Sequence, residues 1–309
     1  MKALFGMQKS FHEKVYGEIE HLSTEERENI TKTLLLALHQ KTSSLAETIH
    51  YKDHHSRHAD PDINNLAYEA VDVARYAIAI MNTWNITEDR FCEAYAEKDA
   101  YLALSLKLNQ NKWDGQPVII VDMDDVIVEF RSNFSKWLED SYGVLADIES
   151  TEYYFIDALK KTGHNPEAVF IDFLNKGGFK SLTPIAGMWE TLQILKKEGY
   201  WIHILTARPE ENLRCKYDTY TWINNRSNPP VDKISFSTEK FRWCANSQYY
   251  DSGLIVCAID DSPKHATEYA KHGLPCLVPV KAYNQNIAIK ENIHYYNNPQ
   301  EIINLIEKL

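Results

Sequence analysis

The sequence predicts an α/β fold, in which a doubly wound parallel sheet with a small helical insertion follows an all-α helical bundle. Apolar runs that end in acidic or hydroxyl residues, at 118–126, 201–208 and 254–261, are typical of buried parallel strands, and helical patterns lie between them. Residues 1 to about 110 show helical periodicity only. Because a single core usually stops growing at about 250–300 residues, a chain of 309 residues is expected to form two domains.

The composition is that of an ordinary globular protein, with 44% hydrophobic and 25% charged residues. No apolar stretch approaches the roughly 18 residues of a membrane span, and the N-terminus shows no signal-peptide pattern. The five cysteines are odd in number and form no CxxC pair, which favours a reduced, cytoplasmic setting. The net charge of −11 argues against a protein that grips a nucleic acid along many phosphates, and it favours a small-molecule substrate.

The first strongly patterned helix has a clear start. Ser23 and Glu26 match a capping box, so we expect the helix to begin near Thr24. Its apolar row comprises Ile30, Leu34, Leu38, Leu45 and Ile49. The polar stretch 53–65 contains Pro61 and is expected to form a loop. Its histidines, His54, His55 and His58, invite a metal interpretation, although loop histidines are more often solvated.

Two more helices complete the predicted bundle. The apolar side of the second comprises Ala67, Ala70, Val71, Ala74, Ile78 and Met81, and its small residues favour close packing. Thr87 is the expected N-cap of the third, which carries Phe91, Tyr95 and Leu102. The segment NKWDGQP, residues 111–117, is expected to link a helical domain at 1–112 to a second domain at 116–309.

Three predicted strands of the second domain end in polar residues. Asp122 and Asp124 end the first, Thr206 ends the second, and Asp260 and Asp261 end a later one. In open α/β sheets the ligand lies at the carboxyl ends of the strands, so these side chains are expected to converge on one crevice. Clustered carboxylates repel each other unless a cation lies among them. A site made only of oxygen ligands suits Mg²⁺.

These motifs resemble those of the haloacid-dehalogenase superfamily over roughly residues 116–285. DMDDV is similar to its first motif, LTAR to its second and IDDSP to its fourth. The third motif is a lysine, for which Lys240 in FSTEK is the best candidate, with Lys233 and Lys264 as weaker alternatives. The resemblance implies a Rossmann-like sheet with a cap and a magnesium-dependent phosphatase.

The resemblance also implies a role for each residue. Asp122 would attack phosphorus and form an aspartyl-phosphate. Asp124 would protonate the leaving oxygen and then activate water. Thr206 would donate a hydrogen bond to the phosphoryl group, and Lys240 would offset negative charge.

The implied metal site uses the same strand ends. Mg²⁺ would be held by Asp122, the backbone carbonyl of Asp124 and Asp261, with Asp260 assisting. An insertion at about 131–182, with Gly177 and Gly178 as a possible hinge, would form the cap that closes over a small substrate.

The local sequence is similar to the 5'(3')-deoxyribonucleotidase branch, which implies a nucleoside monophosphate substrate. Asp125 departs from that branch, which commonly has glycine there. Ala207, Arg208 and Phe130 are candidates for substrate contacts. Aromatic residues that could stack on a base or fill the core of the cap are Phe130, Phe134, Trp137, Tyr153, Tyr154 and Phe155. A second resemblance, to the phosphatase domain of polynucleotide kinases, would instead imply 3'-phosphate ends.

The helical domain resembles the MazG-like and dimeric dUTPase group of nucleoside-triphosphate pyrophosphatases. Glu69 and Asp72 lie at i and i+3 on one helix, and Glu47 lies on the preceding helix. The resemblance implies a second Mg²⁺ site there, with Lys98 near phosphate. Ser44 departs from the pattern, since it stands where the group has a glutamate. Two alternatives remain: a pyrophosphatase that supplies monophosphates to the phosphatase, or a module that forms a homodimer or docks a partner.

Overall fold

The computed structural model describes residues 1–49, 62–150, 155–288 and 291–309. The chain divides into two compact units, Met1–Ala96 and Glu97–Leu309. The division falls inside helix α4 (Glu88–Gln110), and the expected linker at 111–117 lies within the second unit. The loop histidines and the cap residues Tyr153 and Tyr154 lie outside the described residues.

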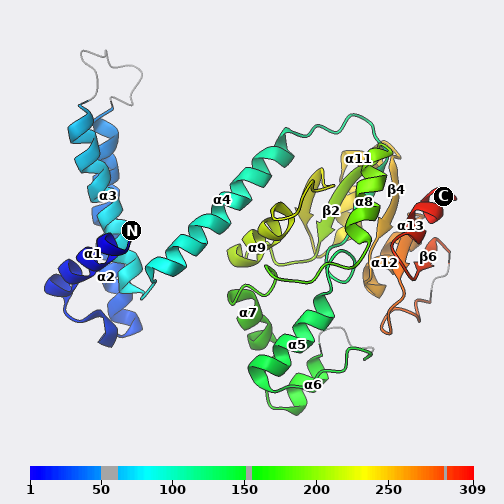
Figure 1. Ribbon diagram of the computed structural model, residues 1–309, viewed down its shortest axis with the longest axis horizontal. Coiled ribbons are helices and arrows are strands. Elements are labelled where there is room, and N and C mark those ends of the chain that lie inside the picture. The colour runs from blue at the N-terminus through cyan, green and yellow to red at the C-terminus, as the bar shows by residue number, and fades with distance from the viewer. Residues whose placement is uncertain (50–61, 151–154, 289–290) are drawn as a thin grey trace. The chain divides into compact units, whose positions relative to one another are not determined.

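The first unit is helical. Its elements are α1 (Lys2–Tyr16), the short 3-10 helix η1 (Ile19–His21), α2 (Thr24–Glu47), α3 (Ile63–Thr83) and the start of α4. The predicted capping box is confirmed, because the Ser23 hydroxyl accepts from the Glu26 N–H and the Glu26 carboxylate accepts from the Ser23 N–H at 2.8 Å. Helix α3 packs against both α1 and α2, and Figure 1 shows α2 and α3 running side by side.

The second unit is built on a six-stranded parallel sheet. Its strands are β1 (Val118–Val121), β2 (Trp201–Thr206), β3 (Lys233–Phe236), β4 (Ile255–Ile259), β5 (Cys276–Pro279) and β6 (Ile293–Tyr296), in the order β3-β2-β1-β4-β5-β6. The predicted α/β fold is therefore confirmed. Strand β6 was not predicted, because its sequence IHYY is short and half polar. The strand order reverses at β1 and β4, which is where open sheets bind ligands.

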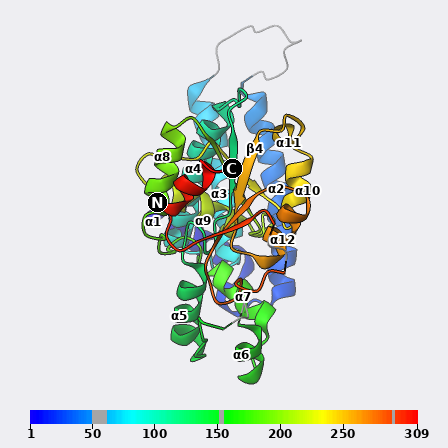
Figure 2. The ribbon, with the colours of Figure 1, turned by 90° about the vertical axis from the view of Figure 1, so that its right-hand side faces the viewer.

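Alternating side chains of the strands feed two cores, one on each face of the sheet. Ile119 and Val121 join the core that includes α8 (Met188–Lys197), α9 (Leu213–Asn224), α13 (Glu301–Ile306) and the end of α4. Val118 and Ile120 join the core that includes α10 (Lys240–Ala245), α11 (Gln248–Asp251) and α12 (Pro263–Lys271). Figure 2 shows α8 and α9 on one side of β4 and α10 to α12 on the other. This three-layer arrangement follows from the period-two pattern of buried strands.

A helical cap is inserted between β1 and β2. It consists of α5 (Phe130–Tyr142), α6 (Ile156–Lys161) and α7 (Pro166–Asn175), which extend away from the sheet in Figure 1. Phe134 and Phe155 are buried against other cap rings, so both fill the core of the cap. A Cβ on Gly178 would collide with the ring of Phe173, which explains a glycine at the end of the cap. In the described parts of the chain, no helix is both long and apolar enough to cross a membrane.

Candidate active site

Three buried carboxylates meet where two neighbouring strands end. Asp122 directly follows β1, and Asp260 and Asp261 directly follow β4. Because β1 and β4 are adjacent and parallel, their carboxyl ends share one edge of the sheet. The Asp122 N–H donates to the Ile259 carbonyl at 2.8 Å, which fixes the two ends together. Each aspartate offers an oxygen within 4.8 Å of the others, the only such acid, histidine or cysteine cluster among the described residues.

Lys240 is the one cation in direct contact with this cluster among the described residues. It is the first residue of α10, and its Nζ lies 2.7 Å from Asp122 Oδ1 and 2.7 Å from Asp260 Oδ2. Burial alone would lower the pKa of Lys240, but the two carboxylates raise it above the ordinary value, so the ammonium is charged. Of the two alternative lysines, Lys233 lies on β3 near Asn109, and Lys264 is exposed on α12.

The cluster carries more negative charge than Lys240 offsets. Burial raises the pKa of Asp122 to about 6, with further repulsion from Asp260 and Asp124, although Lys240 acts in the opposite direction. Burial and the nearby Asp122 raise the pKa of Asp261 well above its usual range. Such shifts are common at functional sites, and another cation among the carboxylates would relieve the repulsion. The donor set consists entirely of carboxylate oxygens, which fits a hard divalent ion such as Mg²⁺.

Asp124 is paired with a buried arginine. Its two carboxylate oxygens accept from Arg208, at 2.9 Å from Nε and 2.5 Å from Nη2. The guanidinium also donates to the Thr219 hydroxyl at 2.9 Å and lies 4.0 Å from the centre of the Phe179 ring. Such a bidentate pair fixes the direction of both side chains. Arg208, which the sequence offered for substrate contact, therefore holds Asp124 in this structure.

Thr206 lies at the end of β2, as the sequence predicts, but its hydroxyl oxygen accepts from the Arg208 N–H at 3.3 Å. The side chain is fully buried and is not among the lining residues of the cavity described below, whereas the next residue, Ala207, is. The structure thus places Thr206 at the predicted edge of the sheet but not in the wall of that cavity.

A cavity of about 240 Å³ lies between the acid cluster and the cap. Its polar lining consists of Asp122, Asp124, Arg208, Lys240, Asp261, Ser262 and His265, and the rest of the lining is Phe130, Phe170, Phe179, Ala207, Pro209 and Pro263. The predicted contacts Phe130, Ala207 and Arg208 are therefore all at the cavity. Phe170 and His265 were missed by the sequence reasoning. Asp261 lies just before a helix, and His265 lies one turn further along. This spacing is the only sequence signal that could have indicated His265 as a residue of the site.

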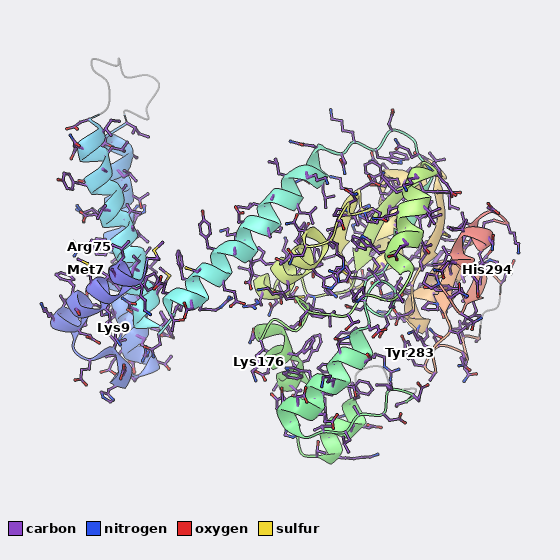
Figure 3. The ribbon with its side chains drawn as sticks, in the orientation of Figure 1. Met7, Lys9, Arg75, Lys176, Tyr283 and His294 are labelled. Carbon is purple, nitrogen blue, oxygen red and sulfur yellow. The ribbon has the colours of Figure 1, made fainter. Side chains whose placement is uncertain are left out.

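Asp125 faces a different cavity. Its backbone has a left-handed φ of 54°, which is rare for a residue other than glycine. Its carboxylate is buried, and Oδ1 accepts from the Arg131 N–H at 3.2 Å. Burial raises the pKa of this carboxyl to about 7. Asp125 lines a separate polar cavity of about 400 Å³ together with Arg131, Lys281 and Tyr283, and Tyr283 donates a 2.6 Å hydrogen bond to Asp261. Tyr283 is labelled in Figure 3.

The acidic residues of the helical unit are arranged differently. Lys41 on α2 lies 2.9 Å from Asp72 and 3.7 Å from Glu69, so two of the predicted metal ligands form ion pairs with a lysine in this structure. Glu47 lies near the end of α2 and, with Glu69 and Asp72, does not form a carboxylate cluster of the kind seen at Asp122 among the described residues. Lys98 falls in the other compact unit.

Comparisons with known proteins extend to the fold alone. No family model matches the chain, and no curated protein matches it significantly. A structure described as a predicted phosphatase from Clostridium acetobutylicum is 14% identical, with a TM-score of 0.43 over 63% of this chain and 99% of that chain. A haloacid dehalogenase-like hydrolase from Streptococcus pneumoniae is 12% identical, with a TM-score of 0.42 over 62% of this chain and 98% of that chain. A predicted phosphoglycolate phosphatase from Haemophilus somnus is 13% identical, with a TM-score of 0.41 over 63% of this chain and 99% of that chain.

Proposed function

We propose that the second unit is a divalent-cation-dependent phosphoric monoester hydrolase that uses Asp122 as its nucleophile. The observation that carries this proposal is that Asp122, Asp260 and Asp261 each offer a carboxylate oxygen within 4.8 Å of the others. Lys240 contacts two of these carboxylates, Asp122 and Asp260. Mg²⁺ would be held by Asp122, Asp261 and the carbonyl of Asp124, with Asp260 assisting. When bound, the ion supplies positive charge that neutralises the phosphoryl oxygens.

The residues of the chain supply the remaining chemistry. Asp122 attacks phosphorus and the bond between phosphorus and the ester oxygen breaks. Asp124, which must give up one of its hydrogen bonds to Arg208 and take up a proton when substrate binds, donates that proton to the departing oxygen. Asp124 then takes a proton from water, which hydrolyses the aspartyl-phosphate and releases inorganic phosphate. Arg208, which follows β2, fixes the orientation of the Asp124 carboxyl through its hydrogen bonds. Lys240 keeps the nucleophile in place and stabilises its negative charge.

We propose nucleoside monophosphates as the substrate class. The cavity is small, lies under the cap and presents the rings of Phe130, Phe170 and Phe179 beyond the carboxylates. Aromatic walls suit a planar base or a sugar face, and a covering cap disfavours a polymer. The alternative, removal of 3'-phosphates from nucleic-acid ends, requires an open path for a strand and is disfavoured by this enclosure.

A substrate screen tests both levels of this proposal. The full chain is incubated with 5'- and 3'-nucleoside monophosphates, sugar phosphates and a 3'-phosphorylated oligonucleotide, with Mg²⁺ or with a chelator, and phosphate release is measured. We expect release from mononucleotides in Mg²⁺ only. Release from the oligonucleotide alone would overturn the substrate class, and activity that persists in chelator would overturn the cation-dependent mechanism.

We further propose that the helical unit is a homodimerisation module and not a pyrophosphatase. Lys41 occupies its acidic pair, and the buried apolar side chains of this unit are few, namely Phe5, Ile19, Leu34, Ile78 and Ala79 within its described residues. Helix α1 carries a row of apolar residues at helical spacing that are each more than half exposed, Leu4, Met7, Phe11 and Val15. Met7 is labelled on this helix in Figure 3. A second copy of the row would cover this surface.

Light scattering after size exclusion tests the dimer. We expect a dimer for the full chain and a monomer after Met7→Glu with Val15→Glu, because charges would enter the apolar contact. Leu145→Glu is the matched control, since Leu145 is as exposed but belongs to the other unit. A wild-type monomer, or release of pyrophosphate from nucleoside triphosphates by the intact chain, would contradict this assignment.

A further inference from the structure

One buried side chain of the catalytic cavity has no role in the mechanism above. His265 lies in the first turn of α12 and is 6% exposed. It lines the cavity beside Ser262 and Pro263, together with Asp122, Lys240 and Asp261. Because this helix starts directly after the cluster, its first turn lies beside the cluster's edge of the sheet.

The imidazole of His265 is not fully hydrogen-bonded in the described structure. Its Nδ1 is buried without a hydrogen-bond partner in the described structure, and the nearest acid, Glu268, is 4.0 Å away. Burial, reinforced by the charge of Lys240, lowers the pKa of His265 to about 4, so the ring is neutral at physiological pH. A neutral imidazole has one donor and one acceptor nitrogen. Since orphaned buried N–H groups are rare, Nδ1 is best assigned as the acceptor, which leaves the N–H on Nε2.

The cavity needs such a donor. In-line displacement places negative charge on the non-bridging phosphoryl oxygens, and preorganised donors stabilise that charge. Thr206, to which the resemblance assigns this task, is fully buried and is not among the lining residues of the cavity, and the Arg208 side chain is engaged with Asp124. His265 lines the same cavity as Asp122 and Lys240.

Resting on the proposed phosphatase activity, we propose that His265 is a further catalytic residue, which donates an N–H hydrogen bond to a non-bridging oxygen of the phosphoryl group at Asp122. It takes over the contact that the sequence pattern assigns to Thr206. A neutral donor suits this position, because the cavity already contains Lys240 and would also hold a divalent cation. The interaction strengthens as charge develops in the transition state.

Three variants test the proposal. His265→Leu removes both nitrogens and keeps an apolar side chain of similar bulk. His265→Gln restores an N–H near the position of Nε2. His272→Gln is the matched control, because His272 follows the same helix but is exposed and stacks on Phe241 outside the cavity. Turnover of the best monophosphate substrate and inhibition by orthovanadate and by inorganic phosphate are measured in Mg²⁺.

We expect His265→Leu to lower kcat/KM about 100-fold, as loss of one oxyanion donor does. Orthovanadate, which mimics the pentacoordinate transition state, should lose affinity by a similar factor, and inorganic phosphate by less. His265→Gln should recover about tenfold, and His272→Gln should match the wild type. If wild type is active and His265→Leu stays within threefold of it, or if orthovanadate affinity does not change, the role of His265 is refuted while the proposed function stands. If the wild-type chain itself hydrolyses no monoester, both proposals fail.

Discussion

Each unit of this protein contains a lysine between two carboxylates, and the two arrangements differ in burial. In the second unit Lys240 lies 2.7 Å from both Asp122 and Asp260, and the three side chains are 1%, 9% and 2% exposed. In the helical unit Lys41 lies 2.9 Å from Asp72 and 3.7 Å from Glu69, and the side chains are 31%, 37% and 23% exposed. The same set of charges therefore occurs in two different dielectric environments.

The difference in burial determines what each set of charges can do. Water reaches the half-buried side chains around Lys41, and ion pairs that water screens contribute little to stability. Around Lys240, burial raises the pKa of the carboxyls and leaves Asp261 without a cationic partner in contact among the described residues. A buried cluster of this kind is consistent with the binding of a divalent cation. We infer that the buried cluster around Lys240 is catalytic, whereas the ion pairs around Lys41 are a surface feature of the helical unit.

The largest expected effect comes from removing the nucleophile. Asp122→Asn should lower phosphate release by at least about a thousandfold, because removing a covalent nucleophile leaves only binding and electrostatic assistance. Asp72→Asn, the matched change in the exposed pair, should leave phosphate release unchanged. Initial rates with the best monophosphate measure both variants. Residual activity of Asp122→Asn above a tenth of wild type would show that another group attacks phosphorus.

The next largest effect is expected from replacing each lysine, which should destabilise the buried arrangement far more than the other. Lys240→Met should lower the free energy of unfolding by about 3–5 kcal/mol in chelator, because Asp122 and Asp260 lose their buried partner. Lys41→Met should leave the midpoint of denaturation close to that of wild type, since its pair is screened by water. Urea denaturation of the two variants measures the contrast. Equal shifts would mean that the burial around Lys240 does not control its contribution.

Magnesium should stabilise only the buried cluster. At a concentration of one hundred times Kd, a ligand that binds the folded state alone adds about 2.7 kcal/mol, which for a domain of this size raises Tm by roughly 5–10 °C. Asp261→Asn should abolish this rise, because Asp261 is the acid of the cluster without a cation in contact in the described structure. Asp72→Asn should retain it. A rise that survives Asp261→Asn but not Asp72→Asn would move the metal site to the helical unit.

The pH dependence of stability provides a smaller effect with a defined sign. The pKa of Asp122 is raised from 3.8 to about 6, so the folded chain keeps a proton between these values that the unfolded chain has released. In chelator, the free energy of unfolding should therefore fall as the pH rises from 4 to 6, by up to about 1.4 kcal/mol per pH unit for each proton retained. Asp125, whose pKa is raised to about 7, extends this window upward.

Mg²⁺ should reverse the trend over the same window, because the ion binds deprotonated carboxylates and its affinity increases with pH. Denaturation curves at pH 4.5, 5.5 and 6.5, with Mg²⁺ and with chelator, measure the two slopes. Identical slopes in both conditions would show that the ion does not contact the titrating carboxylates.

The sequence was informative about backbone position and less so about side-chain direction. Parallel strands share a carboxyl edge, so the positions of Asp122, Asp260 and Asp261 after apolar runs were enough to predict that their side chains converge. The Thr206 hydroxyl accepts from the backbone N–H of Arg208, two residues further along, but the Arg208 side chain is aimed by Asp124, which lies 84 residues away in the sequence. The periodicity of apolar residues along the sequence does not predict such a contact.

The helical unit shows the same limit. The spacing of Glu69 and Asp72 identified two acids on one face of a helix, as i and i+3 residues must be. The residue that meets them, Lys41, comes from another helix, and its arrival depends on how α2 and α3 align against each other. Composition and spacing do not determine that alignment. A lysine between the acids and a metal between the acids were therefore equally compatible with the sequence.

The smallest expected effect tests whether the ion pairs of Lys41 with Glu69 and Asp72 are only a surface feature. Calorimetric titration should find one Mg²⁺ per wild-type chain and still one after Lys41→Met. In that variant Glu69 and Asp72 are released from the lysine, but two half-buried carboxylates are too few ligands for a Mg²⁺ site that competes with hydration. Asp261→Asn, which disables the buried cluster, is the positive control and should remove the observed binding. A second Mg²⁺ that appears with Lys41→Met would show that Lys41 masks a metal site, and pyrophosphate release from nucleoside triphosphates would then be expected from that variant.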